Sequence, residues 1–211
     1  MAQSRRQFGR TLLGLAAGLA SGGVLGLGVP AATPRQPAGP FYPDVPILDD
    51  DNDLTRVAGQ TAQALGAVSD LEGRILDRNG VPIADARVEI WQCDANGRYR
   101  HSRDPGEARL DPGFQGFGHN MTDSGGRYRF RTIRPVPYPG RTPHIHVAVF
   151  VDDGAPFVTQ LYVAGEPRND ADFLYRRIPV ERRERVTAEF AESATPGVAY
   201  SARWDMVLGE V

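Results

Sequence analysis

Two histidines lie two positions apart in an apolar stretch and offer the clearest chemistry in the sequence. His144 and His146 alternate with Ile145 and Val147 in the segment PHIHVAVF at residues 143–150. Since successive side chains of a β-strand point to opposite faces, both imidazoles would lie on one face of a strand. Paired imidazoles at this spacing are a common metal-binding arrangement. The alternative is a pair of solvated or hydrogen-bonded histidines on an open sheet face.

Further ligands would have to come from outside this strand. The segment contains no Asp or Glu, so a zinc site, or an iron site with two histidines and one carboxylate, would need a carboxylate from elsewhere. Tyr138 and Arg141 precede the histidine pair, and Tyr99 follows the segment at residues 88–92. Spacing alone does not select these two tyrosines, because five others occur at positions 42, 128, 162, 175 and 200.

The composition excludes several classes of chemistry. All 24 basic residues are arginines, so the chain has no Schiff-base lysine and no phosphate-binding loop built on lysine. The single cysteine, Cys93, excludes an intrachain disulfide, an iron–sulfur cluster and a paired-cysteine zinc site. The formal net charge of −2 disfavours nucleic acid as a partner. Chemistry must therefore come from His, Tyr, Asp, Glu, Arg or a hydroxyl group.

The elements that would position these residues are short strands. Residues 68–76, 87–92, 127–133, 142–151 and 157–163 have strand character, with turn-forming sequences between them, and residues 198–208 form a plausible last strand. Residues 181–192 are compatible with a short helix or with a strand that has a charged face. Many short strands and few helical periods predict an all-β fold, an antiparallel β-sandwich with few short helices.

Two segments precede this sandwich. Residues 1–32 combine Arg5-Arg6, an uncharged middle and a small-residue end, which is typical of a twin-arginine signal peptide. A retained membrane anchor is the alternative, although the middle is weakly apolar for a span of about 20 residues. Residues 33–66 have a proline every third position from 34 to 46, which predicts an extended arm. The predicted organisation is signal peptide 1–32, arm 33–66 and β-sandwich domain 67–211.

Export would leave a mildly acidic protein. Residues 1–32 hold three of the 24 basic residues and none of the 26 acidic ones, so the remainder carries a formal charge of −5. The expected location is periplasmic or secreted, with the twin-arginine translocation machinery as a partner during export.

Several fragments together resemble one enzyme family, the intradiol ring-cleavage dioxygenases, which includes protocatechuate 3,4-dioxygenase and catechol 1,2-dioxygenase. The resemblance covers nearly the whole chain after the leader. The fragments, in order, are GPFYP (39–43), VEIWQ (88–92), GRYRH (97–101), DSGGRYRF (123–130), YP (138–139), RTPHIH (141–146) and TQLY (159–162). The resemblance implies a β-sandwich that cleaves a catechol-type ring between its two hydroxyls, with dioxygen, to a cis,cis-muconate-type product.

The resemblance also implies a set of site residues. The family holds a non-haem Fe(III) ion with two tyrosinates and two histidines, which here would be Tyr99, Tyr138, His144 and His146. Anionic phenolate ligands favour ferric iron. Tyr138 would be the ligand that departs when a catechol binds, and Arg141 would stabilise negative charge that develops on the ring. Gln160 matches a family glutamine that supports the site.

The chain also departs from the family pattern. Only five residues separate Tyr138 from His144, fewer than in the well-studied members, and no helical N-terminal module precedes the sandwich. The chain is therefore more similar to a single protocatechuate-type subunit or to exported members with a short linker. Trp91, Cys93 and Tyr162 are expected in the core. His101 and His119, which match no ligand position, are expected at the surface.

The sequence thus predicts an exported Fe(III) intradiol dioxygenase that uses a catechol-type substrate and dioxygen, with a homo-oligomer possible. One alternative is a non-catalytic β-sandwich binding module. Another is a zinc or copper enzyme that uses the histidine pair.

Overall fold

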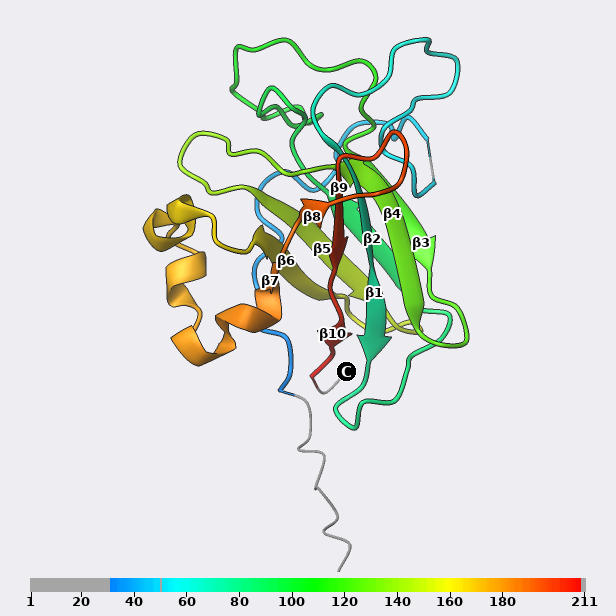
Figure 1. Cartoon of the computed structure of the whole chain (residues 1–211), viewed down its shortest axis with the longest axis vertical. Coiled ribbons are helices and arrows are strands. Elements are labelled where there is room, and N and C mark those ends of the chain that lie inside the picture. The colour runs from blue at the N-terminus through cyan, green and yellow to red at the C-terminus, as the bar shows by residue number, and fades with distance from the viewer. Residues whose placement is uncertain (1–30, 50, 210–211) are drawn as a thin grey trace, which may run out of the picture.

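The computed structural model describes residues 31–49 and 51–209, which fold into two five-stranded sheets (Figure 1). In the first sheet, β1 (Val68–Leu76) pairs on one side with β4 (Arg127–Ile133). On its other side β1 pairs with β9 (Tyr200–Arg203) and β10 (Met206–Val207). Strand β8 (Ala191–Glu192) then pairs with β9. The second sheet has the order β3 (Phe117–Met121), β2 (Arg87–Trp91), β5 (His144–Phe150), β6 (Phe157–Val163) and β7 (Thr187–Ala188).

The main core lies between the two sheets. Strand β5 contributes Ile145, Val147 and Val149 to this core, where they pack with residues such as Leu71 of β1 and Phe130 of β4. These alternate positions share one face of the strand, because the side-chain period of a strand is two. The intervening residues, His144, His146 and Ala148, therefore lie on the outer face of the second sheet.

That outer face is also buried. The first part of the arm, residues 33–49, runs beside β6. There the backbone amide of Gln36 donates to the Val158 carbonyl (2.9 Å), and the Thr159 hydroxyl donates to the Pro34 carbonyl (2.8 Å). In Figure 1 the arm (blue) rises past β7 and β6. Three 3₁₀ segments, η1 (Pro167–Ala171), η2 (Tyr175–Arg177) and η3 (Val180–Val186), follow β6 and lie at the same edge. A polar site on this face is thus enclosed by the arm.

The structure confirms the predicted sandwich and most of its strands. The strands predicted at residues 68–76, 127–133 and 157–163 have these bounds, and those at 87–92 and 142–151 are slightly shorter. The major pairings are antiparallel, whereas β9 and β10 pair with β1, and β7 with β6, in parallel. Apart from isolated bridges, the described part of residues 33–66 contains no helix or strand.

Three regions differ from the prediction. Strand β3 was not expected, because its sequence FGHNM lacks regular alternation. The stretch at 198–208 is split into β9 and β10, because the Asp205 carboxylate accepts from the Arg74 amide (3.0 Å) at the break. Residues 181–192 contain both alternatives, the 3₁₀ segment η3 followed by β7 and β8. The predicted signal peptide lies largely outside the described residues. Among the described residues, no helix has the length and hydropathy needed to cross a membrane.

Candidate metal centre

The histidine pair occupies the start of β5, on the outer face of the second sheet. In the strand register, His146 lies between Trp91 of β2 and Gln160 of β6, and His144 lies beside Tyr162. The indole of Trp91 stacks on His146, with ring centroids 5.0 Å apart and planes 6° from parallel. Both imidazoles are buried, so they are not solvated on an open face, although His144 is hydrogen-bonded to the Thr142 carbonyl (2.6 Å).

Tyr99 is carried by a tight turn after β2. The carboxylate of Asp94 accepts from the backbone amides of Asn96 (2.8 Å) and Arg98 (3.0 Å), and Gly97 adopts the left-handed conformation with φ of 74°. A Cβ atom at Gly97 would lie 3.2 Å from the Pro137 carbonyl oxygen. This close approach brings the turn that carries Tyr99 against the segment that carries Tyr138.

Tyr138 and Arg141 are the two ends of a second turn. The amide of Arg141 donates to the Tyr138 carbonyl (3.0 Å), and Gly140 has φ of 84°. Proline followed by glycine at the central positions is the signature of a type II turn, in which the third residue needs positive φ. The Pro139-Gly140 sequence therefore places the phenol of Tyr138 next to the guanidinium of Arg141.

The four predicted ligand side chains converge. The ring centroids of His144 and His146 are 4.7 Å apart, those of Tyr99 and Tyr138 are 5.4 Å apart, and those of Tyr138 and His144 are 5.5 Å apart. Tyr99 lies edge-on to His146 at 6.1 Å. The two Nε2 atoms are separated by 3.1 Å. Residues 45 positions apart along the chain thus share one small volume.

Burial keeps all four groups neutral in the absence of a cation. It lowers the pKa of His144 to about 3, with help from the Arg141 charge, and lowers the pKa of His146 well below its usual value. Burial also raises the pKa of the phenols of Tyr99 and Tyr138, although Arg141 partly opposes this at Tyr138. A metal ion favours the deprotonated form of its ligands, so it would lower the pKa of the two phenols, whereas the two imidazoles already have the neutral form that binds a cation.

The donor set fits a metal ion that accepts phenolate ligands. The Nδ1–H of His144 donates to the Thr142 carbonyl (2.6 Å), which leaves its Nε2 lone pair free for a cation. Two nitrogen atoms that each lie about 2.1 Å from one metal ion, with an N–metal–N angle of roughly 90°, are about 3 Å apart. The Nε2 atoms of His144 and His146 have this separation. The buried Tyr99 hydroxyl has no hydrogen-bond partner among the described residues. Such an orphaned polar atom is expected of a ligand whose partner is a metal.

No carboxylate joins the histidine pair. Across residues 31–49 and 51–209, no group of three or more His, Cys, Asp or Glu side chains is arranged to hold a metal. The sequence alternatives that required a carboxylate, a zinc site or an iron site with two histidines and one carboxylate, therefore gain no support. The two tyrosines are the residues that accompany His144 and His146.

Arg141 lies beside this set in a buried network. The Nη1 atom of Arg141 lies 3.5 Å from the Tyr138 hydroxyl and 3.4 Å from His144 Nε2. The Nη2 atom donates to Gln160 Oε1 (2.6 Å), and the Nε atom donates to the Asp172 carboxylate (2.7 Å). Gln160, expected to support the site, is fully buried. Sequence reasoning missed Asp172. Its position offers no clear sequence signal, because Asp172 is the C-cap residue of η1 and the N-cap of η2 is Leu174.

The arm closes the site from outside the sheet. Gly39 adopts the left-handed conformation with φ of 75°, and a Cβ atom there would lie 3.2 Å from Cε1 of His146. The ring of Phe41 stacks on Tyr99 with centroids 4.7 Å apart. The carbonyl of Pro37 accepts from the Gln160 side chain (3.1 Å). Three positions of the arm thus contact three different residues of the site.

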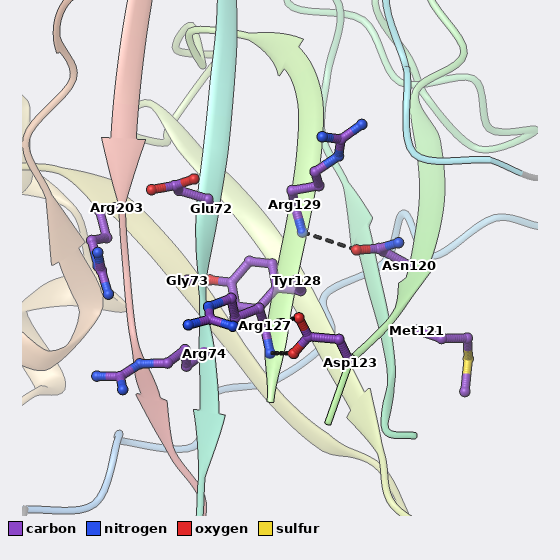
Figure 2. A pocket seen from close by; sticks show the side chains of 10 residues that line it. All are labelled: Glu72, Gly73, Arg74, Asn120, Met121, Asp123, Arg127, Tyr128, Arg129 and Arg203. Atoms are coloured by element: carbon purple, nitrogen blue, oxygen red, sulfur yellow. Dashed lines mark hydrogen bonds and ion pairs between the residues drawn. The ribbon is translucent and has the colours of Figure 1, made fainter. Parts of the chain in front are cut away.

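An open cleft of about 340 Å³ borders the site, and its lining includes Tyr138, Arg141 and Asp172. Tyr138 is half-buried beside it, whereas Tyr99 is fully enclosed. A cleft of similar size, about 350 Å³, lies on the first sheet (Figure 2). There the Arg127 guanidinium pairs with Asp123 (3.7 Å), whose carboxylate also accepts from the Arg127 amide (2.9 Å, Figure 2). The Tyr128 hydroxyl donates to the Trp204 carbonyl (2.6 Å). None of the four predicted ligands lines that cleft, whereas Tyr138 and Arg141 line the other, so the cleft beside Tyr138 is the one next to the candidate site.

Expectations for the remaining residues are mostly confirmed. Trp91, Cys93 and Tyr162 are buried, and burial raises the pKa of the Cys93 thiol to about 12. The expectation that His101 lies at the surface is wrong. The arm covers this residue, with Asp44 3.4 Å from its Nε2 and Phe41 edge-on to its ring. His119, in β3, is half-buried.

Comparisons with known proteins agree with this geometry. A family model described as dioxygenase matches residues 38–210. The chain is 41% identical over 167 residues to the protocatechuate 3,4-dioxygenase beta chain of Burkholderia cepacia, an alignment that covers 75% of this chain and 71% of that one. It is 32% identical over 174 residues to catechol 1,2-dioxygenase of Acinetobacter baylyi, which covers 71% of this chain and 52% of that enzyme.

A solved structure extends the likeness to the fold. The dioxygenase domain of a dioxygenase carbohydrate-binding fusion from Streptomyces superposes with a TM-score of 0.63 at 28% identity, covering 86% of this chain and all of that one. Because the family model spans most of the described residues, the chain belongs to the intradiol ring-cleavage dioxygenase family, and its fold is the β-sandwich of that family.

Proposed function

We propose that Tyr99, Tyr138, His144 and His146 hold a non-haem ferric ion and that the protein cleaves catechol-type rings between their two hydroxyls. The observation that carries this proposal is the convergence of two phenols and two neutral imidazoles on one buried face, with the Tyr99 hydroxyl left without another partner. Bound ferric iron would supply the redox coupling between a catecholate and dioxygen. Anionic oxygen ligands support this choice of metal, because they stabilise the ferric state.

The surroundings of the two tyrosines support a different task for each. Tyr99 is enclosed by the arm and stacked on Phe41, so it stays in place. Tyr138 is half-buried at the cleft, where its phenolic oxygen can leave the ligand set and accept a proton from an incoming catechol hydroxyl. Arg141 Nη1 lies 3.5 Å from that phenolic oxygen and would stabilise negative charge that grows on the substrate.

The substrate class follows from the relatives. The named activities of the relatives, on protocatechuate, catechol and hydroxyquinol, share an aromatic ring with adjacent hydroxyls. We propose the same unit for this chain, with a cis,cis-muconate-type product. The chain spans about half the length of the catechol and hydroxyquinol enzymes that it matches, so ring substituents are not transferred from them.

Metal analysis and oxygen uptake together test this proposal. We expect about one iron per chain, a visible tyrosinate-to-iron absorption band, and consumption of one dioxygen per catechol cleaved. Mass spectrometry of the product should show that both oxygen atoms of ¹⁸O₂ are incorporated. Stoichiometric zinc with no iron, in protein expressed with iron available, would contradict the metal assignment. A colourless protein that binds catechol without consuming oxygen would instead favour the binding-module alternative.

We further propose that the protein is exported through the twin-arginine pathway. The support is the Arg5-Arg6 pair ahead of an uncharged stretch and a small-residue end. Replacement of both arginines by lysine should retain the protein in the cytoplasm, and N-terminal sequencing of the exported wild-type protein should begin near position 32. Export of the dilysine variant at the wild-type level would contradict the assignment.

A further inference from the structure

A buried carboxylate outside the ligand set fixes the catalytic arginine. Asp172 lies between η1 and η2, and its side chain is fully buried. One carboxylate oxygen accepts from the Nε of Arg141 (2.7 Å) and the amide of Thr142 (3.1 Å). The other accepts from the amides of Leu174 and Tyr175, both at 3.0 Å. All four neighbours are donors, and an ionised carboxylate has acceptor sites for all of them.

These bonds join two parts of the chain. Thr142 and Arg141 belong to the segment that leads into β5, whereas Leu174 and Tyr175 belong to the 3₁₀ region after β6. A second buried bond, from the Thr142 hydroxyl to Asn169 (2.8 Å), ties the same two parts together. Burial acts to raise the pKa of Asp172, but the hydrogen bonds from Arg141 and the backbone outweigh it, so the pKa lies below its usual value. The carboxylate is therefore ionised at neutral pH.

The guanidinium of Arg141 has one nitrogen left for the site. Nε is bound to Asp172, and Nη2 is bound to Gln160, whose own amide is held by the Pro37 carbonyl (3.1 Å). Since the guanidinium is planar, two fixed nitrogens fix the third. Nη1 then faces the Tyr138 phenol and His144, at 3.5 and 3.4 Å.

We propose that Asp172 is a positioning residue for ring cleavage, which holds the plane of Arg141 so that Nη1 faces the reacting ring. This inference rests on the proposed function, because it assumes that Arg141 acts on charge that develops on the substrate. Interactions that strengthen only in the transition state change kcat rather than KM. Loss of Asp172 should therefore lower kcat and leave KM nearly unchanged.

Asp172→Asn is a sharp perturbation because it keeps the shape of the side chain. An amide has one acceptor oxygen and one donor nitrogen, so in either orientation its NH₂ group faces two of the four donors. A matched control is Asp111→Asn. Asp111 is also buried, and its carboxylate accepts from the amides of Leu65 (2.6 Å) and Gly113 (2.9 Å) without bonding an arginine in the described structure.

The experiment is a double-mutant cycle on the iron-loaded protein, with Arg141→Ala, Asp172→Asn and the combined variant. We expect Asp172→Asn to retain iron and to lower kcat roughly 10- to 100-fold, as expected for a misplaced catalytic group. The same change in the Arg141→Ala background should cost less than threefold, because Asp172 acts through Arg141. The control Asp111→Asn should lower thermal stability and leave kcat within threefold of the wild type.

Three results would overturn the inference: unchanged kcat in Asp172→Asn, a full additional loss of kcat in the Arg141→Ala background, or an equal loss of kcat in the control. If the Asn variant does not fold, Arg141→Lys tests the same idea, because a single ammonium cannot bond Asp172 and Gln160 and also face the ring. Wild-type kcat in that variant would refute the need for a fixed plane. Failure of the proposed function is distinct, since the wild-type protein would then lack iron or oxygen uptake.

Discussion

Replacement of Tyr99 by phenylalanine should change stability in opposite directions in the metal-free and iron-loaded protein. The Tyr99 hydroxyl is buried, and no described residue bonds it. An unpaired buried hydroxyl costs about 1–3 kcal/mol, so its removal should stabilise the metal-free protein by about that amount. For a domain of this size, each kcal/mol corresponds to about 2–4 °C in Tm. In the iron-loaded protein the same change removes a ligand and should lower iron content, the visible band and Tm.

Tyr128→Phe is the matched control. Tyr128, in the first sheet, is also almost completely buried, but its hydroxyl donates to the carbonyl of Trp204, between β9 and β10 of the same sheet (2.6 Å). Its removal should destabilise the protein by about 1–3 kcal/mol whether or not iron is bound. The assay is thermal unfolding of each variant after chelation and after iron loading, with iron measured by elemental analysis. The reasoning fails if metal-free Tyr99→Phe is destabilised as much as Tyr128→Phe, or if iron-loaded Tyr99→Phe keeps full iron content.

Three further predictions concern the rest of the site. Arg141→Ala should retain iron and colour but lower kcat about 10²–10³-fold, as deletion of an oxyanion donor does, and near wild-type turnover would show that Arg141 is not catalytic. The Gly39→Ala variant should release iron to a chelator faster than the control variant Gly59→Ala. Both glycines have φ near 75°, but only at Gly39 would an added Cβ atom contact His146. Equal release rates in the two variants would refute this role of the arm. Cys93 is buried with a pKa of about 12, so at pH 8 it should react with a thiol reagent only after unfolding, which a reagent titration checks.

The sequence alone determined the features that depend on short-range geometry. The period of two in a strand places His144 and His146 on one face, and the structure shows both on the outer face of β5. Strand-forming residues between turn-forming sequences also located the strands at 68–76, 127–133 and 157–163. The grouping of Tyr99, Tyr138, Arg141 and Gln160 with the histidines came from resemblance to a family, because seven tyrosines offer no local signal that selects two.

Tertiary structure decided which distant groups meet. Asp172 lies 31 positions from Arg141, and no periodicity relates the two residues. The fold of the 3₁₀ region after β6 places the Asp172 carboxylate 2.7 Å from the Arg141 Nε. The burial of His101 likewise depends on the arm, since Asp44 and Phe41 reach it only when the arm packs across the second sheet. Local sequence patterns report the direction of a side chain within its own element. Contacts between elements depend on how loops close and sheets pack, which single-segment patterns do not encode.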